Sequence, residues 1–270
     1  MEKIKLKNGL RALFRLEKSL RGIPLSAYAA EASFFILLSV FPLAMAMGGL
    51  LRRFPYPPEV LINPLRWLLP AGVSELLLTA WEEALESSPG LISLSIFSAL
   101  FASSQGVFAL TRGLNAVLGL QEDRPWLLRR LTAVGQTVLL TGGLLLVSVG
   151  MLFGSRWLQT DQTFLRILRF ILGVGAGFVL LWLTTATLYG ALPARKGRLW
   201  AQKKGAAVTA AGWIIYSAGF AFYADRLADY SRIYGSLSSA AVCLLWLYAC
   251  MYLLFIGAKI NSLAGDANNQ

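Results

Sequence analysis

Three polar side chains recur at helical spacing inside one long apolar stretch of this 270-residue chain. Ser95, Ser98 and Gln105, with Ala102 between them, step by three and four residues and therefore share one face of a helix. Hydroxyl and amide groups on such a face could line a path for a polar solute. They could equally hold helices together, because small and hydroxyl residues are common where helices pack inside membranes. The sequence leaves both interpretations open.

A second group of candidate residues lies in the compact basic segment 195–204, which also contains Trp200. Its five cations are Arg195, Lys196, Arg198, Lys203 and Lys204. Charged heads on apolar stems lie naturally at the level of lipid headgroups, where they attract anionic lipids. We therefore predict that these side chains contact anionic headgroups. A dedicated phosphate-recognition site is the second interpretation of the same segment.

Other residues complete the predicted substrate path, and they border or interrupt the first and last apolar stretches. They are Glu31, Ser39, Pro42, Tyr234, Gly235 and Ser236. Pro42 removes a backbone hydrogen bond and predicts a kink in its helix. Glu31 is either an interfacial carboxylate or a group facing a polar cavity. The Tyr234–Ser236 segment is either a helix N-terminus whose free N–H groups can bind an anion, or a tight turn that leads into the helix.

Several kinds of chemistry are disfavoured by composition. The chain has no histidine, which removes histidine-activated nucleophiles, histidine-ligated zinc and histidine proton relays. It has no Walker motif either. Its clustered carboxylates, Glu82, Glu83 and Glu86, fall in a segment that we predict to be external. We therefore predict no metal, no cofactor, no nucleic-acid partner and no enzymatic activity.

The elements that must position these residues are six stretches without Asp, Glu, Lys or Arg. They are 32–51, 87–111, 131–155, 170–194, 205–224 and 233–258. A helix needs about 20 apolar residues to cross a bilayer, and each charge in the core costs roughly 2.5–3.5 kcal/mol. Hydrophobic residues make up 56% of the chain and charged residues 14%. The sequence therefore predicts an all-α, polytopic membrane protein with six transmembrane helices.

The basic residues between these stretches predict the orientation. Alternate segments hold 17 Lys and Arg residues on one side and 8 on the other. Since the richer side faces the cytoplasm, both termini are predicted to be cytoplasmic. Residues 1–27 are predicted to form a basic amphipathic interfacial helix. The transmembrane domain is predicted over 28–262, followed by a cytoplasmic tail, 263–270. Its crossings are expected at about 28–51, 88–111, 131–155, 170–194, 205–224 and 233–258, with an external amphipathic helical segment at 56–87.

Short motifs spread over about 20–262 give the chain a family likeness. They include Ala32–Phe35 and Leu38–Leu43, Gly106, Gly113–Asn115, Arg124–Trp126, Leu192–Pro193, Trp200, Gly205–Ala206, Phe222–Tyr223, Tyr234–Leu237, Leu245–Tyr248 and Gly257–Asn261. In their order and spacing the chain resembles the YihY/BrkB family of bacterial inner-membrane proteins, once labelled ribonuclease BN. One departure is Lys259, because the family usually has an acidic residue at that place.

The resemblance implies six crossings, cytoplasmic termini and a location in the bacterial inner membrane, but no settled activity. From the residues we expect a transporter or lipid-handling protein that moves an amphipathic or anionic solute. The alternative is a non-transporting scaffold that binds lipid or a partner protein, and a ribonuclease is disfavoured. Membrane lipids, mainly anionic, are the expected partners. A homo-oligomer and further protein partners stay open.

Overall fold

The computed structural model describes residues 14–51, 78–79, 82–83, 86–125, 127–129, 131–132, 134–135, 163–226 and 238–266. This part of the chain is helical and contains no strand, which confirms the all-α prediction. Five long helices and one short 3₁₀ helix position the candidate residues. They are α2 (Leu25–Leu51), α5 (Pro89–Leu118), α7 (Thr163–Ala191), η2 (Leu199–Gln202), α8 (Lys203–Arg226) and α10 (Ser238–Asp266).

Five of the six predicted crossings fall mainly on these long helices, because the charge-free stretches offer no polar break. Among the described residues, three helical stretches are long and apolar enough to cross a membrane: Gly90–Leu118, Leu199–Tyr223 and Ala240–Gly265. A fourth arises if Phe14–Leu20 and Leu25–Val40, which meet at 75°, form one bent span. The crossing predicted at 131–155 and the external segment 56–87 lie largely outside the described residues. Six crossings therefore remain a prediction.

Local sequence signals explain the bounds of α5, the longest helix. Ser88 is its N-cap and accepts a hydrogen bond from the Leu91 backbone N–H, and Pro89 occupies the first turn. At the other end Gly119 takes a left-handed conformation, with φ of 66°, that stops the helix. The helix therefore extends seven residues beyond the predicted limit at 111 and carries Arg112 in its last turns.

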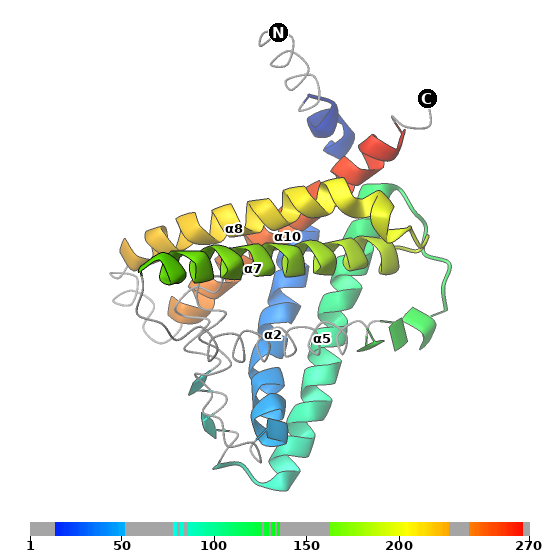
Figure 1. Cartoon of the computed structure of the whole chain (residues 1–270). Helices are drawn as coiled ribbons and strands as arrows, with labels where there is room; N and C mark the ends of the chain where they lie inside the picture. Colours follow the sequence, from blue (N-terminus) through cyan, green and yellow to red (C-terminus); the bar gives the residue numbers. More distant parts are fainter. Residues whose placement is uncertain are drawn as a thin grey trace.

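The helices pack as an antiparallel pair and a group of three. α2 and α5 run in opposite senses, since Glu31 pairs with Arg112 near one end and Met45 contacts Ser95 near the other. α10 packs against α8, α2 and α5, while α7 packs against α8. In Figure 1, α2 and α5 run down the view, whereas α7 and α8 run across it. The described helices therefore do not share one axis direction.

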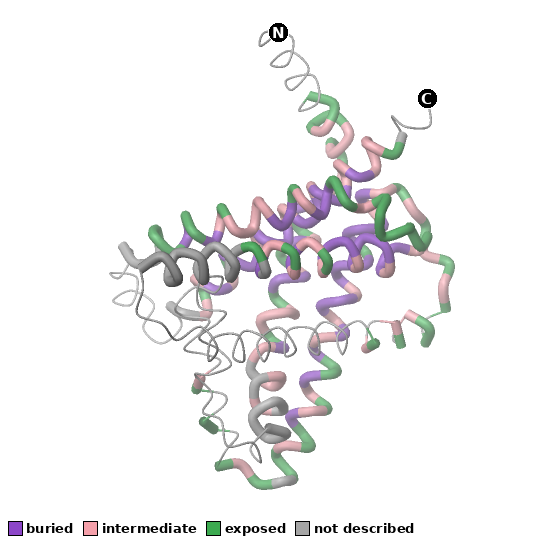
Figure 2. The backbone as a smooth tube through the Cα atoms, in the orientation of Figure 1, coloured by how far each residue is buried: buried purple, intermediate pink, exposed green. Residues whose placement is uncertain are grey.

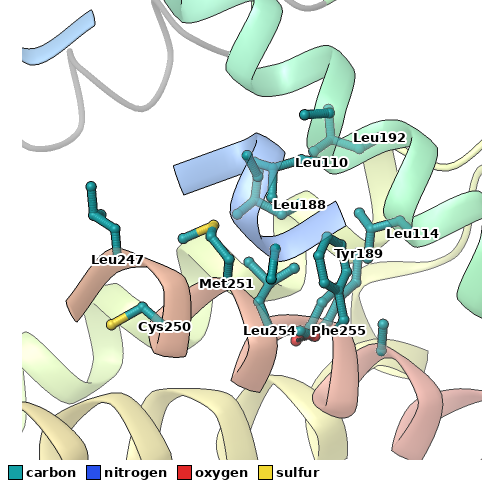
Figure 3. Close-up of a cluster of buried hydrophobic side chains, with 14 of the residues drawn as sticks. Leu110, Leu114, Leu188, Tyr189, Leu192, Leu247, Cys250, Met251, Leu254 and Phe255 are labelled. Carbon is teal, nitrogen blue, oxygen red and sulfur yellow. Dashed lines mark hydrogen bonds between the residues drawn. The ribbon is translucent and has the colours of Figure 1, made fainter. Parts of the chain in front are cut away.

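A cluster of buried apolar side chains lies where α10 meets the ends of α5 and α7. Figure 3 shows Leu110 and Leu114 of α5 beside Leu188 and Tyr189 of α7, with Leu254 and Phe255 of α10 below them. Figure 2 shows buried positions concentrated in this region, whereas the far half of α5 is largely exposed or half-buried. Cys243 and Cys250 are both buried and free, as expected for packing residues on one helix face.

One end of the molecule gathers the basic segments, and we call it the basic end. Here α2 and α8 begin and α5, α7 and α10 finish, so the described chain ends lie near each other (Figure 1). Three contacts establish this meeting. Ala194 after α7 bonds to Asn115 of α5, Gly205 of α8 bonds to Asn261 of α10, and Lys259 of α10 bonds to Val117 of α5.

Candidate functional site

The polar face predicted on α5 exists, and part of it is packing surface. Ser95 is buried, donates to the Leu91 carbonyl at 2.9 Å and lies 3.7 Å from the sulfur of Met45 on α2. Ala102 on the same face is also buried. Ser98 and Gln105 are half-buried and have no hydrogen-bond partner among the described residues. The face therefore combines helix contact with two polar side chains that remain available.

The candidates on α2 lie along the same helix pair. Glu31 forms an ion pair with Arg112 at the basic end, where both side chains are partly exposed. Ser39 is buried and donates to the Ile36 carbonyl of its own helix at 2.7 Å. Pro42 is half-buried inside α2, which continues to Leu51. The last three path candidates, at positions 234–236, lie outside the described residues.

The basic connection between α7 and α8, residues 195–204, presents its charges outward. Its five cations, Arg195, Lys196, Arg198, Lys203 and Lys204, are exposed and form no ion pair with the described residues. Trp200, 75% exposed, and Leu199 lie among them. The backbone beneath is held in place, because Gly197 N–H donates to the Gly190 carbonyl at 3.0 Å and Trp182 Nε1 donates to the Lys203 carbonyl at 3.1 Å.

A polar cluster that was not among the predicted site residues holds the start of this connection. We call Asn115, Glu122 and Arg124 the Asn115 cluster. Asn115 is buried and uses both ends of its amide: Nδ2 donates to Glu122 Oε2 and Oδ1 accepts from the Ala194 N–H, both at 2.8 Å. Arg124 donates twice to the Glu122 carboxylate, at 2.7 and 2.8 Å, and once to the Leu192 carbonyl at 2.9 Å.

Charge-assisted hydrogen bonds make this cluster stronger than a neutral one. The side chains of Glu122 and Arg124 are each 17% exposed, so water screens the pair only partly. The hydrogen bond from Arg124, helped by that from Asn115, lowers the pKa of Glu122 although burial opposes the shift. The same bond raises the pKa of Arg124. The pair therefore stays ionised at neutral pH.

Lys259, the departure from the family pattern, has a structural role here. Its Nζ donates to the Val117 carbonyl at 3.0 Å, in the last turn of α5. The final carbonyls of a helix lack partners within the helix, and a cation there also complements the helix dipole. Lys259 therefore caps α5 from α10. An acidic side chain at this place could not donate the same bond while ionised.

Asn261 caps α8 in a comparable way. Its Oδ1 accepts a 2.6 Å hydrogen bond from the Gly205 N–H, while Arg198, at the start of η2, gives no side-chain cap. The helices approach closely at this place. A Cβ on Gly205 would lie 2.6 Å from Asn261 Cγ and would overlap the Gly257 carbonyl oxygen. Glycine is therefore required on both helices, as at other close crossings of membrane helices.

Buried hydrogen bonds continue this contact along α7, α8 and α10. The Tyr189 hydroxyl donates to the Leu254 carbonyl at 2.7 Å and lies 2.7 Å from the Thr209 hydroxyl. Because Tyr189 has one hydroxyl proton, Thr209 is the donor to it. Trp213 Nε1 donates to the Cys250 carbonyl at 2.7 Å, and Trp246 Nε1 donates to Ser217 Oγ at 3.1 Å.

The resemblance motifs gave the one available signal for these contacts. The described residues of five motifs are separate in sequence but meet at the basic end. They are Gly113–Asn115, Arg124–Pro125, Leu192–Pro193, Gly205–Ala206 and Gly257–Asn261. The predicted path residues on α2 and α5 do not join this group, apart from Glu31 through its pair with Arg112. In the described part of the chain, no three His, Cys, Asp or Glu side chains are grouped to hold a metal ion.

Comparison with known proteins finds the family that these motifs resemble. The family described as virulence factor BrkB matches residues 19–270. The ribonuclease-like protein YfkH of Bacillus subtilis is 29% identical over 87% of this chain and 88% of its own length. UPF0761 membrane proteins of Chromobacterium violaceum and Laribacter hongkongensis are each 27% identical over 87% of the chain.

The chain spans only 57% and 56% of those two UPF0761 proteins, so they contain a further part with no counterpart in the match. No solved structure matches the chain. The family match covers nearly all of the sequence, and the UPF0761 relatives are named as membrane proteins, in keeping with the long apolar helices. The chain is therefore a membrane protein that belongs to the BrkB virulence-factor family.

Proposed function

We propose that this protein binds anionic amphipathic molecules, with lipids foremost, at the basic end and moves them across the bacterial cytoplasmic membrane. The observation that carries the proposal is the basic connection 195–204. It places five exposed cations beside the exposed Leu199 and Trp200 on a backbone held by α7 and α8. Cations beside apolar and aromatic groups suit a molecule with an anionic head and an apolar tail.

The polar face of α5 supports movement in addition to binding. Ser98 and Gln105 lie on the membrane-crossing part of α5 and have no described hydrogen-bond partner. A polar group in the hydrocarbon region is costly unless it finds a partner. A headgroup passing along this face would supply one. Gln105→Leu or Ser98→Leu should therefore reduce transport while folded protein is retained.

The test of binding uses the full chain in nanodiscs that contain phosphatidylglycerol or phosphatidylcholine alone. Native mass spectrometry should find phosphatidylglycerol retained on the wild type and its retention reduced at least tenfold in the triple variant Arg195→Gln, Lys196→Gln, Arg198→Gln. The matched control removes three charges from the segment predicted on the opposite side of the membrane, with Arg52→Gln, Arg53→Gln and Arg66→Gln. Equal retention of the two lipids by the wild type, or unchanged retention in the triple variant, would refute the assignment of this surface.

The transport step is tested separately with a fluorescent anionic lipid in proteoliposomes. Faster exchange between leaflets than in protein-free vesicles, lost in Gln105→Leu, is the expected result. Lipid binding without any exchange would reject movement and favour the scaffold alternative, in which the same surface anchors lipid. The name ribonuclease-like belongs to the Bacillus relative, and no described feature of this chain favours that activity.

A further inference from the structure

The helices divide into two units that differ in how they are held together. The first unit is the antiparallel α2–α5 pair, which meets along much of its length. Gly106 allows this approach, since a Cβ there would lie 3.1 Å from the Ile36 side chain. The second unit is α7, α8 and α10. Its helices are tied by the buried side-chain hydrogen bonds of Tyr189, Trp213 and Trp246 and by the glycine crossing of α8 and α10.

The contact between the two units has a different character. Along α10 it is apolar, with Phe255 packed against Gly113 of α5 and Tyr28 of α2. Apolar contacts have no directional bonds to break, so these surfaces can shift against each other without leaving a buried polar group unsatisfied. Directed bonds between the units lie at the basic end. The Ala194 N–H donates to Asn115, Arg124 donates to the Leu192 carbonyl, and Lys259 donates to the Val117 carbonyl.

We propose that the Asn115 cluster is a releasable latch that holds the α2–α5 unit against the α7–α8–α10 unit at the basic end. The inference does not depend on which molecule the protein moves. Two features support a releasable contact. Both bonds from the cluster to the second unit involve main-chain groups in the 192–194 segment just after α7. They can therefore break without disturbing the hydrogen bonds within that unit. The charged pair is also partly exposed, so water can replace its partners.

The geometry also explains why three side chains act as one device. The Glu122 carboxylate accepts hydrogen bonds from Asn115 and Arg124 at once, and it thereby orients the Asn115 Oδ1 acceptor and the Arg124 donor toward the second unit. Loss of Asn115 or Arg124 removes one of the two bonds to the second unit, and loss of Glu122 releases both side chains from the carboxylate that orients them. Separation of the units at this end would expose the space beside the basic connection, which is where a cytoplasmic gate is needed under the proposed function. Rigid-body movement of one helix unit against another is a known route to gating.

The experiment measures distances between spin labels by pulsed electron resonance on the full chain in nanodiscs, in a Cys243→Ala, Cys250→Ala background. One label pair, Ala116→Cys on α5 with Ala191→Cys on α7, reports the distance between the two units. A second pair, Lys204→Cys on α8 with Gly265→Cys on α10, lies within one unit. Asn115→Ala and Arg124→Gln should lengthen and broaden the first distance and leave the second unchanged.

The matched control is Arg112→Gln, which breaks the Glu31 pair within the first unit and should leave both distances unchanged. Glu122→Gln is the milder variant if the others fail to fold, because it keeps the size of the side chain while it removes the charge and one of the two acceptor oxygens. Unchanged inter-unit distances in the folded cluster variants would overturn the latch. Equal broadening of both label pairs would also overturn it, since the cluster would then hold the whole fold together.

Discussion

Replacing Tyr189 by phenylalanine tests whether the α7–α8–α10 unit is held by buried hydrogen bonds. Tyr189 is only 3% exposed, and its hydroxyl makes two bonds of 2.7 Å, to the Leu254 carbonyl and to Thr209. Hydrogen bonds between membrane helices contribute about 0.6 kcal/mol on average and up to about 1.7. Losing both should therefore lower the free energy of unfolding by about 1–2 kcal/mol, with the ring and its packing retained.

The assay is unfolding of the protein in mixed micelles as the fraction of dodecyl sulfate rises, followed by tryptophan fluorescence. Tyr248→Phe is the matched control, because Tyr248 is half-buried on α10 and its hydroxyl has no described hydrogen-bond partner. Thr209→Val and the double variant complete a mutant cycle. The loss of unfolding free energy in the double variant should be smaller than the sum of the two single losses by about 0.5–1.5 kcal/mol. A Tyr189→Phe protein as stable as the wild type, or as stable as Tyr248→Phe, would refute the reasoning.

Three further predictions concern the basic end. Gly257→Ala should destabilise by about 1–3 kcal/mol in the same assay, because its Cβ would lie 2.5 Å from the Tyr189 hydroxyl, while Gly219→Ala, with no atom within 4 Å, should be neutral or stabilising. Asn261→Ala removes the cap on α8 and should cost about 1 kcal/mol, which Asn261→Asp should largely restore; equal losses in the two variants would argue against capping. The pKa of Glu122 is held below its ordinary value of 4.5. The stabilisation that its ionised carboxylate gives the folded state is therefore complete above that pH and is lost as the pH falls through the lowered pKa. The difference in melting temperature between wild type and Glu122→Gln should therefore be constant from neutral pH to about 5 and shrink below it; a constant difference down to pH 3 would contradict this assignment.

The sequence alone was enough to determine the class of protein and most helix positions. In a bilayer, backbone N–H and C=O groups have no water to bind, and a helix satisfies all of them within one stretch. This constraint acts on each charge-free stretch separately. The described α2, α5, α7, α8 and α10 accordingly overlap the predicted crossings. The excess of Lys and Arg in alternate segments likewise predicted that these segments share one side, and the described ones meet at the basic end.

The tertiary structure decided which polar residues act together. Asn115 lies in the last turn of α5, and Glu122 and Arg124 lie in the short connection after it. Their partners Ala194 and Leu192 are 79 and 68 residues away in the sequence. No local pattern encodes a contact over that separation, because it depends on how α5 and α7 finish beside each other. The same holds for Lys259 and Asn261. Their sequence shows only a polar ending to an apolar helix, whereas the fold makes them caps for two other helices.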